Sequence, residues 1–451
     1  MKTLACLLLL SSLTFASTHH VPKDFVSIQS AIDASSAGDR ILVSAGTYPE
    51  RIALKPHVTL RSAGDDQMGA SGLRRAERTI LDGGVVGEGP GVRMAEASTL
   101  DGFTVTRVGA YDAEAWRKAH ATQGENQSHE HIGEFGTPGI GVEDVTCMIR
   151  NNIVHHNGFT GIALSGANNE SRVHNNTCFR NMGGGIGLMD GSKSEVRGNT
   201  CYENYYAGIG HDDSDPLIID NDCYLNIRAG IGISHGASPT VVSNRCYQNR
   251  RAGIGIRTDP DTQPIVQANE CYLNDMAGIG VRERAAPELI GNHCYSNKLA
   301  GIGVRLDATP TIYKNLIHSN GLVGIGLAST ENGLAKITGN RVSDHKMPAL
   351  SIQSGWKVVA NDNVLERSEG LPPVVMVFAG AEVSFARNKF MGPGVAGVRV
   401  AGTATFRTNT FDGVTVRKRG PPHYGIWVLD GGIIDENGGD VFRNWREDIH
   451  R

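Results

Sequence analysis

The chain repeats one motif every 22 to 25 residues through its middle. One copy reads NRCYQNRRAGIGIR and begins at Asn244. A fixed period of this length indicates a stacked architecture, in which each copy buries its apolar face on its neighbours. Since three short β-type runs per copy leave no room for a helix, we predict an all-β fold built as a parallel β-helix with three strands per coil. The first asparagine recurs at Asn152, Asn176, Asn199, Asn221, Asn244, Asn269, Asn292, Asn315 and Asn340, and a Gly-Ile pair begins at Gly161, Gly185, Gly208, Gly230, Gly253, Gly278, Gly301 and Gly324.

The continuity of the repeat predicts one elongated domain rather than several compact ones. We place this domain at residues 17–451, with regular coils over about 140–345 and looser coils with a C-terminal cap after residue 346. The columns predict about 14 coils. Residues 25–37 have helical spacing of apolar positions and are expected to cap the first coil, whose open edge would otherwise invite aggregation.

Composition and the N-terminus limit the partners and the location. The formal net charge of −4 is too small to indicate nucleic acid as a partner. Beyond the N-terminus, the sequence holds no transmembrane segment, since none of its stretches has the roughly 20 apolar residues that a membrane span needs. Lys2, an apolar run from Leu4 to Leu10 and small residues up to Ala16 predict a signal peptide over residues 1–16. We therefore expect a secreted or periplasmic protein.

Each coil alternates inward and outward side chains. In the stretch from Gly253 to Arg257, we expect Ile254 and Ile256 to point inward and Gly253, Gly255 and Arg257 to point outward. The repeated asparagine is expected to turn the chain into the third strand and to bond up and down its column. A cysteine column points inward and is expected to pack as free thiols, with metal binding as the alternative: Cys178, Cys201, Cys223, Cys246, Cys271 and Cys294.

Here the chain resembles a known superfamily. The stretch VPKDFVSIQSAIDASSAGDRILVSAGTYPERIAL and the later TILDGG look like the opening of right-handed β-helix proteins of the pectate-lyase-like superfamily. The N-x-C-Y-x-N and G-I-G patterns resemble its generic repeats, and together the similarity covers most of residues 21–415. It implies a right-handed solenoid. Its members include lyases, epimerases and noncatalytic accessory proteins, and no specific enzyme signature is present, so no catalytic residue is carried over.

Two outward columns are candidates for binding a polymer. Absent side chains at one glycine column leave a flat lane, unless glycine there only satisfies a special backbone conformation: Gly187, Gly210, Gly232, Gly255, Gly280, Gly303 and Gly326. The second column is aromatic, and it either stacks along the sheet or contacts sugar rings. It contains Phe179 and the predicted substrate-binding residues Tyr202, Tyr224, Tyr247, Tyr272 and Tyr295, flanked by His155 and His318.

A charged strip beside the glycine lane supplies the candidate chemistry. Arginine forks suit the carboxylates of an acidic polysaccharide, so Arg257, Arg282 and Arg305 are predicted to bind, with Arg257 and Arg282 also counted among the catalytic residues. Lyase or epimerase chemistry also needs a base, for which His211 and His235 are candidates, together with Asp212 and Asp213 as catalytic carboxylates. Adjoining loops add Asp190, Asp215, Asp259, Glu283, Arg284 and Asp307, of which Asp259, Glu283, Arg284 and Asp307 are predicted to bind substrate. The alternative is a solvated strip whose opposite charges pair across coils.

Two further features bear on the site. His211 aligns with inward apolar positions and therefore either finds a buried partner or marks a local break that turns it outward. No motif requires a cofactor, although Asp212, Asp213 and Asp215 offer oxygen ligands that suit Ca²⁺. An insertion at residues 110–136 contains Trp116, His120, His129 and His131 and is expected to cover one face. A second insertion at residues 417–423 is expected to be a surface loop.

These observations support two functions. The first is an exported enzyme that acts on acidic polysaccharide by lyase or epimerase chemistry. The second is a noncatalytic β-helix that binds a glycan or assists another exported protein. An enzyme needs a compact acid–base arrangement, whereas a binder needs only the lane and the columns beside it.

Overall fold

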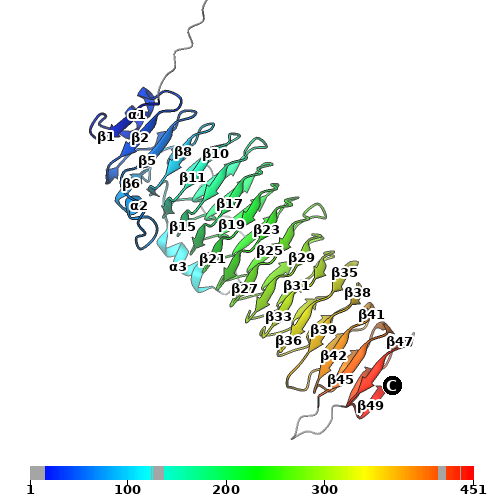
Figure 1. Cartoon of the computed structure of the whole chain (residues 1–451). Helices are drawn as coiled ribbons and strands as arrows, with labels where there is room; N and C mark the ends of the chain where they lie inside the picture. Colours follow the sequence, from blue (N-terminus) through cyan, green and yellow to red (C-terminus); the bar gives the residue numbers. More distant parts are fainter. Residues whose placement is uncertain (1–15, 123, 125–136, 415–422, 437) are drawn as a thin grey trace, which may run out of the picture.

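The computed structural model describes residues 16–122, 124, 137–414, 423–436 and 438–451 and shows one long solenoid (Figure 1). Three parallel sheets run its whole length, with 17, 16 and 16 strands among the described residues. Sheet A extends from β1 (Thr18–Val21) to β47 (Ile433–Glu436), sheet B from β3 (Gly46–Tyr48) to β48 (Val441–Arg443), and sheet C from β4 (Ile52–Ala53) to β49 (Glu447–His450). The prediction of an all-β parallel solenoid with three strands per coil is confirmed.

One coil shows how the repeat is used. The motif GIG forms β25 of sheet C (Ile254–Ile256), the chain then turns into β26 of sheet A (Ile265–Gln267), and Glu270–Tyr272 form β27 of sheet B. Residues one period apart are paired, so that Ile254 lies between Ile231 and Ile279. The sheet C strands at the centre of the rod are β16 (Ile186–Met189), β19 (Ile209–Asp212), β22 (Ile231–Ser234), β25, β28 (Ile279–Val281), β31 (Ile302–Val304) and β34 (Ile325–Leu327).

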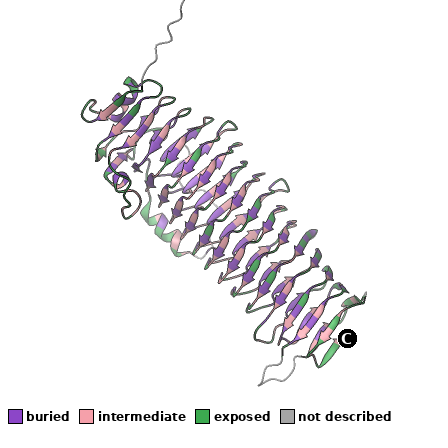
Figure 2. Cartoon of the chain, in the orientation of Figure 1, coloured by how far each residue is buried: buried purple, intermediate pink, exposed green. Residues whose placement is uncertain are grey.

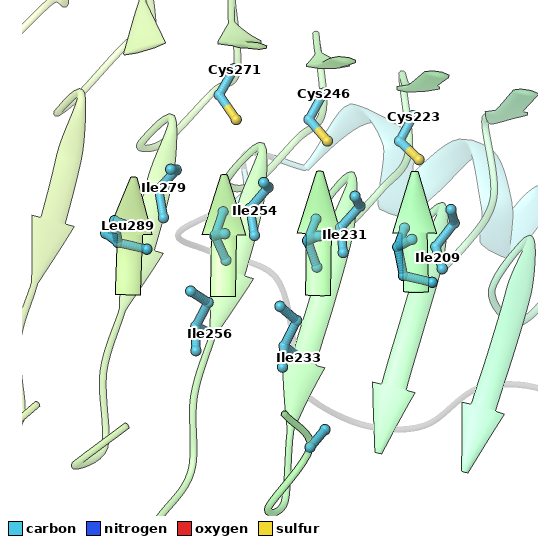
Figure 3. Packing of buried hydrophobic residues seen from close by; sticks show 14 of the residues in the cluster. Ile209, Cys223, Ile231, Ile233, Cys246, Ile254, Ile256, Cys271, Ile279 and Leu289 are labelled. Carbon is cyan, nitrogen blue, oxygen red and sulfur yellow. The ribbon is translucent and has the colours of Figure 1, made fainter. Parts of the chain in front are cut away.

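The core is a stack of identical apolar layers. Buried and more exposed residues alternate along the strands, as the period of two requires (Figure 2). Figure 3 shows Ile231 and Ile254 beneath the sulfur atoms of Cys223 and Cys246, each layer repeating the one before it. The six cysteines of the column are free and buried, as predicted. They therefore pack as small apolar side chains.

Two asparagine ladders fix the turns on either side of sheet B. In the first, Asn221 Nδ2 donates to Asn244 Oδ1 (2.9 Å) and also to the buried carbonyl of Val196 (2.9 Å). In the second, formed by the last asparagine of the N-x-C-Y-x-N pattern, Asn226 Nδ2 donates to Asn249 Oδ1 (3.0 Å) and to the carbonyl of Cys201 (3.0 Å). Each amide satisfies turn backbone that lies away from water, which explains the return of asparagine at both positions.

The two ends of the rod differ from each other. At the N-terminus α1 (Ile28–Ala34) begins at a Ser27 capping box and buries Ile28, Ala31 and Ile32 on the first coil, as predicted. At the other end the prediction of an irregular cap is wrong, because β47, β48 and β49 pair in parallel with the preceding strands and form a further coil. The estimate of about 14 coils was also too low against sheets of 16 and 17 strands.

The first insertion lies across the turns that lead from sheet B to sheet C. Its helix α3 (Ala113–Ala121) packs Trp116 against Met182, Tyr205 and Ile227 of three successive coils. The indole Nε1 donates to the carbonyl of Glu203 (2.7 Å). The rest of the insertion, with His129 and His131, lies outside the described residues, as do most of residues 1–16 and of 417–423. The short helix α2 (Arg74–Arg78) packs against the N-terminal coils.

No helix within the described ranges is both long and apolar enough to cross a membrane.

Candidate functional site

The outer face of sheet C carries the bare glycine column. Consecutive strands place Gly232, Gly255 and Gly280 side by side, in register with the rest of the column. None of the seven lane glycines has a positive φ. A Cβ added at Gly210 would meet no heavy atom within 4 Å, and one at Gly255 would meet only Ala229 Cβ at 3.6 Å. The alternative explanation, a special backbone conformation, is therefore wrong for this column.

The other glycine of each GIG motif is required by the fold. A Cβ at Gly253 would lie 2.7 Å from the carbonyl oxygen of Gly278 and 2.9 Å from Asn274 Nδ2, so these atoms would have to move. This position faces the crowded inner corner beside the cysteine column and not the solvent, which corrects the prediction that Gly253 points outward. Packing thus explains the first glycine of the motif, Gly253, but not the second, Gly255.

Small residues from the preceding turn widen the lane. The methyl groups of Ala207, Ala229 and Ala252 would lie 3.5–3.6 Å from a Cβ on Gly232, Gly255 and Gly280, each on the next coil. The turn residues of one coil therefore lie beside the strand of the following coil. The result is a floor of glycine and alanine that runs along the rod axis, across the strands.

Arginines border both edges of this floor. Arg257, Arg282 and Arg305 follow the strands β25, β28 and β31, as predicted, and are half-buried or exposed. On the opposite edge, Arg228 and Arg251 come from the turns before sheet C. Sequence reasoning missed these two, although their place directly before the recurrent Ala-Gly pair was visible.

Electrostatics confirm that the arginines form one group. Burial, followed by repulsion from Arg228, Arg282, Arg257 and Arg305, lowers the pKa of Arg251 to about 10. Burial is also the main cause of the lowered pKa of Arg282, whose Nε lies 3.1 Å from Glu283 Oε1. The guanidinium of Arg228 lies over the ring of Tyr206 at 4.4 Å from its centroid. Positive charge is thus concentrated along the lane over four coils.

A histidine–carboxylate pair lies at one end of this arginine group. His235 Nδ1 is 2.7 Å from Asp212 Oδ1, and each side chain is 57% exposed. Asp212 pairs with Ser234 in the sheet, and Arg257 follows Ile256 on the next coil. Both side chains thus face the same solvent as the lane, and their roles as base and catalytic carboxylate stay predictions.

His211 does not belong to this group. The residue is 3% exposed, between Leu188 and Ile233 in the sheet, so it points inward as its alignment predicted. Neither ring nitrogen has a hydrogen-bond partner among the described residues, and burial lowers its pKa to about 3. The candidate role of His211 as a base for a surface ligand is therefore wrong, and so is the expectation of a satisfied buried partner.

Three of the six predicted loop carboxylates hold loops together. Asp307 Oδ1 accepts from Thr330 Oγ1 (2.6 Å) and from the backbone N–H of Asn332 (2.6 Å). Asp215 accepts from the backbone N–H of Ser238 (2.9 Å), and Asp259 from that of Asp261 (3.2 Å). The nearby Asp213, Asp259, Glu283, Arg284 and Asp307 all sit in left-handed turns beside the lane. No group of three or more histidine, cysteine or acidic side chains suited to a metal ion occurs in the described part of the chain, so the Asp212–Asp215 loop shows no preformed Ca²⁺ site.

The tyrosine column on sheet B is a continuous stack. Neighbouring rings from Phe179 to Tyr295 lie 4.9–5.1 Å apart with interplanar angles of 5–10°. His155 and His318 extend the stack at its two ends. Because each ring covers the faces of its neighbours, the tyrosines present only edges and hydroxyl groups to solvent. The predicted stacking of sugars on these faces is therefore excluded within the column.

With this geometry described, the chain can be compared with known proteins. The family model for the right-handed β-helix region matches residues 125–269 and 252–390, more than half of the chain. The chain belongs to the right-handed β-helix family. No curated protein matches it by sequence.

Several solved structures resemble this β-helix protein at low identity. The mannuronan C-5 epimerase AlgE6 A-module of Azotobacter vinelandii is 16% identical, with a TM-score of 0.39 over 92% of this chain and 94% of its own. The periplasmic alginate epimerase AlgG is 17% identical, with a TM-score of 0.45 over 80% and 82%. A GH87 α-1,3-glucanase catalytic unit from Streptomyces thermodiastaticus is 14% identical, with a TM-score of 0.43 over 93% and 65%. These likenesses concern the fold alone.

Proposed function

We propose that this β-helix protein binds an acidic polysaccharide along the outer face of sheet C. The observation that carries the proposal is the bare lane itself. Glycine within a strand costs about 0.5–1 kcal/mol relative to alanine, yet six of the seven lane glycines stand where a Cβ would fit or need only a small adjustment of a neighbour. The exception is Gly326, where a Cβ would lie 2.8 Å from Val323 Cγ2. A polymer lying close to the backbone explains this cost.

The charges beside the lane indicate the ligand class. Arginine binds carboxylate through two parallel hydrogen bonds, and Arg257, Arg282 and Arg305 recur once per coil at the spacing of adjacent strands, about 4.8 Å. A polymer with an acidic group on each sugar presents a carboxylate at comparable intervals. The half-buried position of Arg282 strengthens the electrostatic contact, because it is less screened by solvent than a fully exposed pair.

A second function, cleavage or epimerisation of the bound chain, is favoured by the His235–Asp212 pair. The carboxylate fixes the orientation of the imidazole through Nδ1, which leaves Nε2 to take the proton beside a sugar carboxylate. Arg257 would then stabilise the negative charge that develops on that carboxylate. In cleavage, the electron pair left on the sugar carbon would form a double bond as the glycosidic oxygen leaves, and that oxygen would take the proton held by His235. In epimerisation, solvent water would return a proton to the same carbon from the opposite face.

Export is part of the same proposal. The signal peptide inferred at residues 1–16 would place the protein where acidic polysaccharides occur. Mass spectrometry of protein recovered from the periplasm or the medium would show whether the mature chain begins near Ser17. An intact Met1 on cell-internal protein would contradict export.

The deciding experiment is a binding screen of purified protein on alginate, pectate and glycosaminoglycans. We expect retention that decreases as salt is raised and that Arg257→Ala with Arg282→Ala removes. Growth of ultraviolet absorbance from an unsaturated product, abolished by His235→Ala, would establish a lyase, and a change in sugar configuration by NMR would establish an epimerase. No retention on any acidic polymer would contradict the proposed function.

A further inference from the structure

The glycine lane is closed at one end by large side chains. The same outward column continues in register from Gly326 to Ser351 and then to Met376, Arg399 and Trp427. These residues belong to β37 (Leu350–Ile352), β40 (Val375–Val377), β43 (Ala396–Val400) and β46 (Tyr424–Val428). A polymer lying on the floor of the lane therefore meets side chains that stand up from the next coils.

The obstruction is held rigidly. The guanidinium of Arg399 lies over the indole of Trp427 at 4.6 Å from its centroid. Tyr424 packs 5.5 Å from Trp427 and stacks on His450 at 4.2 Å with an interplanar angle of 8°. Phe378, on the neighbouring outward position, remains 39% exposed. The lane thus ends at a cluster of aromatic side chains, and the guanidinium of Arg399 lies on the side of this cluster that is nearer to the glycines.

Arg399 is equipped to bind an anion. Its Nε is buried without a hydrogen-bond partner in the described part of the chain. By contrast, Arg282 at the lane forms an ion pair with Glu283. Arg399 therefore offers guanidinium donors to a ligand that arrives along the lane.

The opposite end of the lane is bounded as well. The column before Gly187 holds Ala163, and on the coil before that a Cβ at Gly141 would lie 3.0 Å from Pro90. The open floor consequently extends from Gly187 to Ser351, which are eight coils in register. At about 4.8 Å per coil, this gives a floor of about 34 Å.

We propose that the lane binds the end of an acidic polysaccharide chain rather than its interior, and that Arg399 contacts the carboxylate of the terminal sugar. This inference rests on the proposed function and adds a direction to it, because the end of the bound polysaccharide lies at the Arg399 end of the lane. An interior segment would have to leave the floor at Met376, and would lose contact there, whereas a chain end stops at the aromatic cluster. The Arg399–Trp427 pair is then the terminal subsite.

The test counts proteins bound per polymer chain. Wild-type protein is mixed with a short and a long preparation of the same acidic polysaccharide, and the complexes are measured by light scattering and sedimentation. We expect the number of proteins per chain to be the same for both lengths. A number that grows in proportion to chain length would overturn the inference while leaving the proposed function intact, whereas no binding to either would contradict both.

Substitution of the terminal subsite sharpens the test. Arg399→Met keeps an aliphatic side chain on Trp427 and removes the charge, and we expect roughly tenfold weaker binding of chain ends. Arg407→Met removes a charge from the outer face of sheet A instead and should change nothing. Met376→Gly, Arg399→Gly and Trp427→Ser together extend the bare floor past all three obstructing positions and should make binding proportional to chain length. If Arg399→Met and Arg407→Met bind equally, Arg399 has no role in end binding.

Discussion

The outer faces of sheets B and C share one backbone geometry and use it in opposite ways. On sheet B, the central coils carry tyrosine in one outward column, and the rings stack on each other. On sheet C, the same coils carry glycine in the corresponding column, and almost nothing touches that position. Stacked side chains stabilise a sheet, so the sheet B column is explained by the fold, whereas the sheet C column costs stability. This difference is what supports the proposed binding site on sheet C.

The strongest way to break this comparison is to remove the arginines at the lane. We expect Arg257→Ala with Arg282→Ala to weaken binding of acidic polysaccharide by roughly 100-fold, because charge-assisted hydrogen bonds contribute about 1.5–3 kcal/mol each. The thermal unfolding of the variant should remain close to that of the wild type. Affinity electrophoresis provides the measurement, and Arg245→Ala on sheet B is the matched control. Equal loss of binding in that control would remove the distinction between the faces.

Disruption of the tyrosine stack tests the other half of the comparison. Tyr247→Ala removes two stacked neighbours, Tyr224 and Tyr272, each pair contributing about 0.5–1.5 kcal/mol beyond burial of area. We expect the free energy of unfolding to fall by about 2 kcal/mol in a denaturant titration and the retention on acidic polysaccharide to persist. A variant of normal stability that no longer binds would place the ligand on sheet B.

The interior of sheet C provides a test of stability alone. His211→Leu replaces a buried ring without hydrogen bonds by an apolar side chain like Leu188, so we expect a gain of roughly 1–3 kcal/mol. The folded pKa of about 3 lies below the ordinary value of about 6.5, so the folded state binds fewer protons between them. The free energy of unfolding of the wild type should therefore fall as the pH drops from about 6.5 toward 3. In the variant, the part of this pH dependence that comes from His211 should be absent.

Retention of the His211→Leu protein on acidic polysaccharide should be unchanged, because the ring does not reach the lane. Loss of binding or of activity in this variant would return His211 to the site.

The fold was predictable from the sequence because it depends on residue types that recur at the same position of each coil. The isoleucine, cysteine and asparagine positions recur with the coil, and each satisfies a requirement that is local to one layer. The last coil was mistaken for a cap, since it lacks the asparagine and Gly-Ile marks although its strands still pair.

The candidate site was predictable only in part. Arg257 and Arg282 lie on a regular strand position and were identified, whereas Arg228 and Arg251 lie in turns that face the following coil. This offset of one coil follows from the path of the chain in space, and aligning the repeats with one another does not reveal it. The end of the lane was missed for a related reason, because the spacing changes before Met376 and Arg399. The missing hydrogen-bond partners of the His211 ring could not be predicted from the sequence either, because they depend on which residues surround the ring in space.

The direct test of the central claim fills the lane without disturbing the fold. Gly255→Val with Gly280→Val adds side chains to two successive strands, and Ser343→Val in β36 (Arg341–Ser343) adds bulk to the outer face of sheet B as the control. Since a β-branched residue suits a strand and glycine costs about 0.5–1 kcal/mol there, we expect the double variant to be as stable as the wild type or more so. It should lose retention on acidic polysaccharide while the control keeps it. A stable double variant that binds as the wild type does would contradict the account.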